Sequence, residues 1–286
     1  MRYLNRLLLG LVLLVWSCGD VGPQQQKSEA PPLPAHEERW SVFLRQQANG
    51  PQVITVDQGW SEQAPLETHP RLLEVIVKAE ETLPTGFPTE AETKMANELQ
   101  GQLLQKLERG NFGVFAGSMV VPGEKRLYFY LRAEPEADAL AQEVVTAYTK
   151  REVEAKIAPD ETWATYSTQL FPREQEQAEI NNDGVLIRLQ EAGDPLSQPR
   201  PIEHWAYFKS TKARSVFRDS LERYRFEPIG YDTLDQAGMP YGIHFMRQDS
   251  IHSPYIHDLT WGLTELAEEL GGAYDGWETI VVKPQK

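Results

Sequence analysis

The chain contains almost no cysteine, and this scarcity excludes two kinds of structural support. Cys18 is the only cysteine among 286 residues. No disulfide can therefore form within the chain, and a zinc site built from several thiolates is ruled out. Basic residues are also outnumbered, because 28 Lys and Arg stand against 42 Asp and Glu and leave a net charge of −14. This balance argues against nucleic-acid binding and against adhesion to anionic lipid by charge alone, since both need a basic surface.

The chain also lacks a long hydrophobic run, apart from one short segment near its start. Residues 7–16 (LLLGLVLLVW) follow Arg2 and Arg6. They are too few to span a bilayer, which takes about 20 residues, but they have the length of the apolar region of a signal peptide. Ser17, Cys18 and Gly19 then resemble the lipobox of bacterial lipoproteins. We therefore expect residues 1–17 to be a lipoprotein signal peptide and Cys18 to be the lipid attachment site.

This start predicts a location in the bacterial cell envelope, with membrane attachment through the N-terminal lipid and either a periplasmic or an outer-membrane position. An ordinary signal peptide and an uncut N-terminal anchor remain alternatives. Residues 18–38 are rich in Pro, Gln, Ser and Ala. Such a segment cannot bury apolar area, so we expect it to be a disordered tether.

The rest of the chain divides into two parts, residues 39–172 and 173–286, in which apolar segments are abundant enough to form packed cores. In the first part, turn and periodicity signals predict these elements: strands at 40–44, 53–56, 71–79, 112–121, 126–132 and 152–157, and helices at 89–109 and 138–150. In the second part they predict a leading helix at 175–190, strands at 204–209, 226–231, 242–247 and 274–282, and helices at 213–224 and 255–270.

Both parts thus contain the order β-α-β-β-α-β, which is typical of the split βαβ, or ferredoxin-like, arrangement. We predict an α+β protein of two tandem ferredoxin-like domains, with antiparallel sheets that carry helices on one face. The boundary is expected near residues 172–180. No residue-level identity relates the two parts, so the repeat lies in the pattern alone.

Two segments of the second part resemble a known family. Residues 200–208 (RPIEHWAYF) and 271–278 (GGAYDGWE) are similar to the regulator of ribonuclease E activity B, a family of ribonuclease E inhibitors, and the resemblance covers about residues 175–284. It implies a ferredoxin-like fold and a protein inhibitor without catalysis or cofactor. The known member binds a cytoplasmic endoribonuclease. Because the expected signal exports this chain, the resemblance transfers the fold and leaves the partner open.

The first part resembles a family named domain of unknown function 695. The residues that carry this resemblance are Trp40, the hairpin at 117–130 and the segment TWATY at 162–166. That family implies an α+β domain and no particular activity.

The candidate binding residues are mainly aromatic and lie on two strands that neighbour each other in the expected fold. Trp and Tyr commonly anchor protein interfaces, although core packing is the alternative for each of them. Asp275 and Gly276 precede Trp277 and are expected to form a bulge or turn that directs this side chain. The full set of partner-binding candidates is Trp205, Tyr207, Tyr274, Asp275, Gly276 and Trp277.

The sequence offers little for catalysis. It has no nucleophile elbow, no phosphate-binding Gly loop and no His-Glu-x-x-His segment. We therefore predict a non-catalytic envelope lipoprotein that binds or inhibits a protein of unknown identity, with no metal, no cofactor and no nucleic acid. One alternative is a metal-assisted hydrolase using His244, His252 and His257. The other is a cytoplasmic regulator of ribonuclease E, should the signal not be used.

Overall fold

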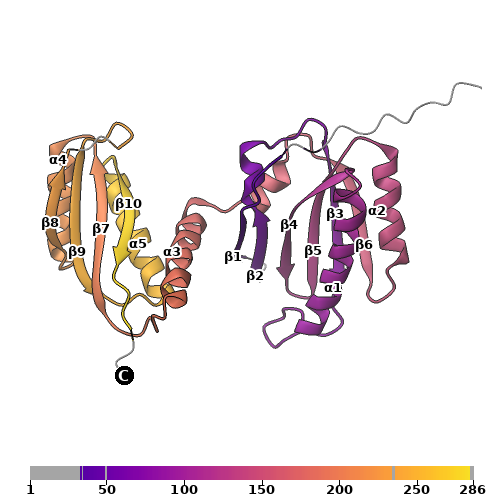
Figure 1. Ribbon diagram of the computed structural model, residues 1–286, viewed down its shortest axis with the longest axis horizontal. Coiled ribbons are helices and arrows are strands. Elements are labelled where there is room, and N and C mark those ends of the chain that lie inside the picture. Colours follow the sequence, from indigo (N-terminus) through magenta and orange to yellow (C-terminus); the bar gives the residue numbers. More distant parts are fainter. Residues whose placement is uncertain (1–32, 34, 49, 234–235, 284–286) are drawn as a thin grey trace, which may run out of the picture. The chain divides into compact units, whose positions relative to one another are not determined.

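The computed structural model describes residues 33, 35–48, 50–233 and 236–283. The expected signal peptide, Cys18 and the tether up to residue 32 lie outside these residues. The described chain is an α+β protein with two antiparallel sheets, one of six strands and one of four (Figure 1). The predicted α+β class with antiparallel sheets is therefore confirmed. Within the described residues, no helix is both long enough and apolar enough to cross a membrane.

The first sheet belongs to the N-terminal half. Its strand order is β1-β2-β4-β5-β3-β6. Two helices connect its strands, and Thr89 caps the first of them by accepting a hydrogen bond from the backbone N–H of Glu92. The elements are β1 (Trp40–Gln47), β2 (Gly50–Asp57), β3 (Arg71–Lys78), α1 (Glu90–Leu103), β4 (Gly113–Val121), β5 (Glu124–Leu131), α2 (Pro135–Ala147) and β6 (Val153–Pro159).

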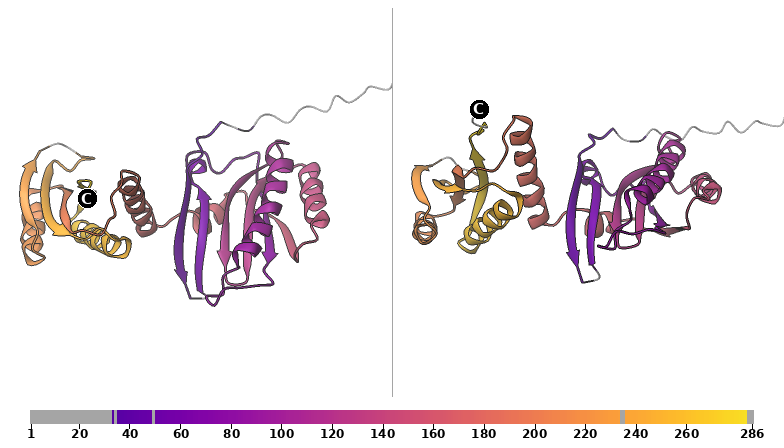
Figure 2. Two further views of the ribbon diagram at one scale, coloured as in Figure 1. Left: turned by 60° about the horizontal axis from the view of Figure 1, so that its bottom comes forward. Right: turned by 90° about the horizontal axis from the view of Figure 1, so that it is seen from below.

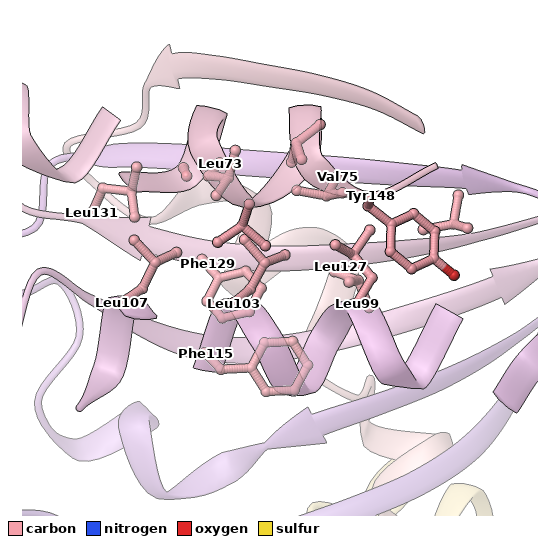
Figure 3. Close-up of a cluster of buried hydrophobic side chains, with 14 of the residues drawn as sticks. Leu73, Val75, Leu99, Leu103, Leu107, Phe115, Leu127, Phe129, Leu131 and Tyr148 are labelled. Atoms are coloured by element: carbon pink, nitrogen blue, oxygen red, sulfur yellow. The ribbon is translucent and has the colours of Figure 1, made fainter. Parts of the chain in front are cut away.

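Helices α1 and α2 pack on the same face of this sheet (Figures 1 and 2). The leucines that recur at four-residue spacing on α1 point into the core against alternate residues of β3 and β5. Figure 3 shows Leu99 and Leu103 beside Leu127 and Phe129. Each of these four side chains is fully buried. Burial of this apolar layer is the main force that holds the helices on the sheet.

The opposite face of the six-stranded sheet is also covered, which the predicted arrangement of helices on one face does not provide. Residues along β4 and β5 are buried on both sides. The cover comes from the segment after β6, which includes the short π-helical turn η3 (Tyr166–Leu170). Trp163 stacks on Tyr130 with ring centroids 3.9 Å apart and donates its indole N–H to the carbonyl of His69. This irregular segment has no periodicity from which its burial could be predicted.

The four-stranded sheet belongs to the C-terminal half, and its strand order is β10-β7-β9-β8. A helix precedes the first strand and two more connect the strands. The elements are α3 (Glu174–Glu191), β7 (Arg200–Phe208), α4 (Thr211–Arg223), β8 (Glu227–Asp232), β9 (Tyr241–Asp249), α5 (Ser253–Glu269) and β10 (Gly272–Thr279).

Helices α4 and α5 lie on one side of this sheet, behind the strands in Figure 1. Phe217 and Leu221 of α4 and Leu263 of α5 meet Phe208 and Phe245 of the strands in a buried cluster. Helix α3 packs against α5. The helices of this half therefore leave the other face of its sheet without a helical cover, and we call this surface the open face.

Candidate functional site

The six candidate residues come together on β7 and β10, which pair as antiparallel neighbours. Tyr274 is opposite Ala206, Gly276 is opposite Trp205, and Trp277 is opposite His204. The register does not place them on one surface, however. Ala206 and His204 face the helices and Trp205 faces the other way, because successive strand residues alternate between faces. The candidates therefore divide between the helix-covered face and the open face.

A bulge at Asp275 determines the face on which Trp277 lies. The β10–β7 register shifts between Tyr274 and Gly276, so Asp275 has no opposite residue. The extra residue places Tyr274 and Trp277, which are three positions apart, on the same side of the sheet. Gly276 has a φ of 130°, a conformation that residues with a side chain rarely adopt. The bulge predicted from the Asp-Gly pair is present, and it turns Trp277 toward the helices.

Tyr274 is held inside the fold by a buried histidine. Its hydroxyl lies 2.8 Å from Nδ1 of His204, which is fully buried and stacks on Phe245 with ring centroids 5.3 Å apart. Burial, with smaller contributions from Arg247 and His244, lowers the pKa of His204 from 6.5 to about 3. Burial likewise raises the pKa of Tyr274 well above its ordinary value. Both groups therefore stay neutral near pH 7, and their contact is structural.

Trp277 contacts α3. Its indole N–H donates to Oδ1 of Asn182 at 2.7 Å, and the ring packs against the apolar cluster that contains Leu186 and Ile256. Asn182 in turn donates to the hydroxyl of Thr260 on α5 at 2.8 Å. One face of this arrangement borders a groove of about 810 Å³ between α3, α5 and β10. Trp277 thus joins the two helices to the strand while lining the groove.

Trp205 lies at the centre of the open face. It is partly exposed and stacks on His244 of β9, with ring centroids 4.3 Å apart and an interplanar angle of 13°. Nε2 of His244 lies 2.7 Å from Oε2 of Glu203, the residue two positions before Trp205 on β7. The side chains of His244 and Glu203 are 26% and 39% exposed. These three residues form a solvent-accessible cluster on the paired strands β7 and β9.

Tyr207 is on the same face as Trp205 but is only 6% exposed. Burial, followed by the charges of Asp232 and Asp275, raises its pKa. Tyr207 is therefore covered near one end of the open face, whereas Trp205 remains accessible. Of the two β7 aromatics that the sequence singled out, only Trp205 can contact a partner without rearrangement.

The three histidines of the metal hypothesis are not brought together. His244 pairs with Glu203 on the open face, whereas His257 contacts Asp183 of α3 at 3.0 Å. His252 precedes α5, and its ring lies 5.5 Å from that of Tyr255. Across the described ranges, no group of three or more His, Cys, Asp or Glu side chains is arranged to hold a metal ion. The metal-assisted hydrolase based on these residues therefore lacks its geometry.

Two features of this region were not predicted from the sequence. Glu203 and Glu278 stand directly opposite each other on β7 and β10. Gly276 leaves open space beside Trp205, since a Cβ added there would meet nothing within 4 Å. The alternation of β7 places Glu203 and Trp205 on one face. On β10 the bulge at Asp275 interrupts this alternation, so the sequence alone does not show that Gly276 and Glu278 share that face. Their positions follow only from the register of the two strands.

Both halves match families. Residues 179–279 match the family described as Regulator of ribonuclease activity B, and residues 38–171 match a family of unknown function, DUF695. The two resemblances drawn from the sequence are thereby confirmed, and the first supports a regulatory role through protein binding. No curated protein matches the chain. A solved structure, the crystal structure of an unknown protein from Galdieria sulphuraria, covers 74% of this chain and 99% of its own at 9% identity. Its TM-score of 0.21 is too low to support any argument.

Proposed function

We propose that this chain is a non-catalytic envelope lipoprotein that binds another protein through the open face of its C-terminal sheet. The observation that carries the proposal is Trp205, a partly exposed aromatic residue at the centre of a sheet face that no helix of its half covers. Trp is enriched among the residues that dominate binding energy at protein interfaces. The match to the Regulator of ribonuclease activity B family supports a binding role for the same half.

We also infer that both halves are ferredoxin-like. In the C-terminal half, β7, β8, β9 and β10 with α4 and α5 follow the order β-α-β-β-α-β, and the sheet order is β10-β7-β9-β8. In the N-terminal half, β3 to β6 with α1 and α2 follow the same order, and the sheet order β4-β5-β3-β6 has the same pattern when reversed. Strands β1 and β2 then extend the N-terminal sheet beyond β4.

The lipoprotein part of the proposal rests on the apolar run at 7–16 and on the position of Cys18 directly after Ser17. The test is metabolic labelling with palmitate and fractionation of cells that express the full chain or its Cys18→Ala variant. Label in the membrane fraction for the natural chain alone is the expected result. Unlabelled cytosolic protein in both cases would overturn the envelope location.

The binding part is tested by crosslinking in intact cells followed by capture of the tagged full chain. A specific partner is expected to be lost upon Trp205→Ala and retained upon Val216→Ala. Val216 is 43% exposed on α4, which lies on the opposite side of the sheet, so its truncation is a matched surface control. Equal capture by the natural chain and the Trp205→Ala variant would show that the open face is not the binding surface.

The second candidate function is control of a ribonuclease in the cytoplasm, and the family name favours it. It requires that the start region is not used as an export signal. The palmitate experiment separates the two, because a lipidated chain in the envelope cannot meet a cytoplasmic enzyme directly.

A further inference from the structure

The open face is acidic as well as aromatic. The register assigns Glu203 to this face on β7, Glu227 on β8 and Glu278 on β10. None of the described strand positions that share this face carries Lys or Arg. Elsewhere in the described chain many surface carboxylates pair with a basic residue, as Glu98 does with Lys150. A carboxylate-rich face whose strand positions hold no Lys or Arg is complementary to a basic partner.

Glu203 and Glu278 make the charge arrangement costly in the absence of a partner. They are direct cross-strand neighbours, and like charges in this position destabilise a sheet. Glu203 directs one oxygen to His244, which leaves the repulsion from Glu278 to be relieved by solvent or by a bound cation. Glu278 is exposed, so a partner can reach it.

The space beside Trp205 suits the head of a basic side chain. His244 covers one face of the indole ring, and the register partner on the other side is Gly276, which has no side chain. A Cβ placed at Gly276 would meet nothing within 4 Å. A guanidinium or ammonium group in this space would contact the indole face and lie near the carboxylates of Glu203 and Glu278. Trp is the best aromatic acceptor for such a cation–π contact.

The breadth of the acidic face favours a peptide segment over a single small cation. Its carboxylates extend from Glu278 on β10 through Glu203 on β7 to Glu227 on β8, in one row across three strand spacings. That distance is about 14 Å, and four residues of an extended chain cover about 13 Å. Basic side chains four residues apart in an extended segment would therefore reach both ends of the face.

We propose that the open face binds an extended segment of the partner protein with Arg or Lys at four-residue spacing, one basic head lying over Gly276 beside Trp205. This inference rests on the proposed function and specifies the chemistry of the partner. Carboxylates repel nucleic acid and anionic lipid headgroups, so the charge of the face selects against both.

The test uses a fluorescein-labelled peptide with three Arg residues separated by Gly-Ser-Gly, titrated with the lipid-free chain from residue 19 onward. We expect saturable binding that weakens at least tenfold in a Glu203→Gln/Glu278→Gln variant. The matched control is Glu265→Gln/Glu269→Gln, which removes the same charge from exposed positions of α5. This control should bind within twofold of the natural chain. Trp205→Leu should also weaken binding about tenfold without changing the net charge.

Each alternative outcome is informative. Equal weakening by both double variants would mean general attraction between a polycation and an acidic protein, and would overturn the inference. Capture of an envelope partner through Trp205 together with absence of peptide binding would overturn the basic-segment inference and leave the proposed function intact. Self-association that disappears upon Glu203→Gln/Glu278→Gln would identify a second copy as the occupant and would also contradict the inference.

Discussion

The buried pair of His204 and Tyr274 makes the C-terminal half sensitive to acid. The histidine ring is fully buried, its Nδ1 contacts the Tyr274 hydroxyl, and its Nε2 has no hydrogen-bond partner. A proton on this ring would place an unpaired charge in an apolar cluster, which explains why its pKa falls from 6.5 to about 3.

The sign of the effect follows from proton binding in the two states. Between pH 6.5 and about 3, the unfolded chain binds a proton at His204 that the folded chain does not bind. The free energy of unfolding is therefore unaffected by His204 above pH 6.5 and decreases as the pH falls below that value. At pH 5.0 the loss is about 2 kcal/mol, since one pKa unit corresponds to about 1.4 kcal/mol.

The test replaces both partners by apolar residues of similar shape, His204→Phe/Tyr274→Phe, so that no buried polar group is left alone. Urea denaturation of the full chain at pH 7.5 and 5.0 gives the free energy of unfolding. Comparison with the natural chain at each pH removes the contributions of other groups, such as His69, whose pKa is also lowered, to about 4. The natural chain should lose about 2 kcal/mol more than the variant. Equal losses would refute the assignment of a neutral, buried His204.

Three further substitutions and one control variant test separate parts of the structure, with urea denaturation as the measurement of the free energy of unfolding. Asp194→Asn leaves Arg200 buried without its ion-pair partner and should lower the free energy of unfolding by about 3–5 kcal/mol. A decrease below about 1 kcal/mol would contradict the buried ion pair. Leu99→Ala opens a cavity in the fully buried N-terminal core and should cost about 2–5 kcal/mol. Gly276→Ala should lower the free energy of unfolding by about 1–3 kcal/mol, because alanine is strained at the positive φ of this position. The control is Gly262→Ala on α5, where an added Cβ also meets nothing within 4 Å, and this variant should be as stable as the natural chain or more stable.

The order of elements could be predicted from the sequence because it depends on local signals. Leucines at four-residue spacing indicate helix α1. The pair Pro122-Gly123 marks the turn between β4 and β5, and Gly271-Gly272 marks the end of α5. Each of these signals depends on residues that are close together in the sequence. The bulge at Asp275 was readable for the same reason.

The surroundings of the candidate residues could not be predicted, because they depend on contacts between distant segments. Trp277 bonds to Asn182 of α3, which precedes it by most of the C-terminal half. Tyr274 meets His204 only because β10 pairs with β7. Trp163 covers the second face of the six-stranded sheet from an irregular segment. Periodicity reports whether a side chain is buried, but not which partner buries it.

The most direct test of the central claim is site-specific photo-crosslinking in living cells. Benzoylphenylalanine replaces Met246, whose register position places it on the open face opposite Glu203, or Val216 on α4 as the control. The account predicts a discrete crosslinked protein from position 246, none from position 216, and loss of the crosslink when Trp205→Ala is added. A partner crosslinked from position 216 alone, or one from position 246 that is indifferent to Trp205, would contradict binding through the open face.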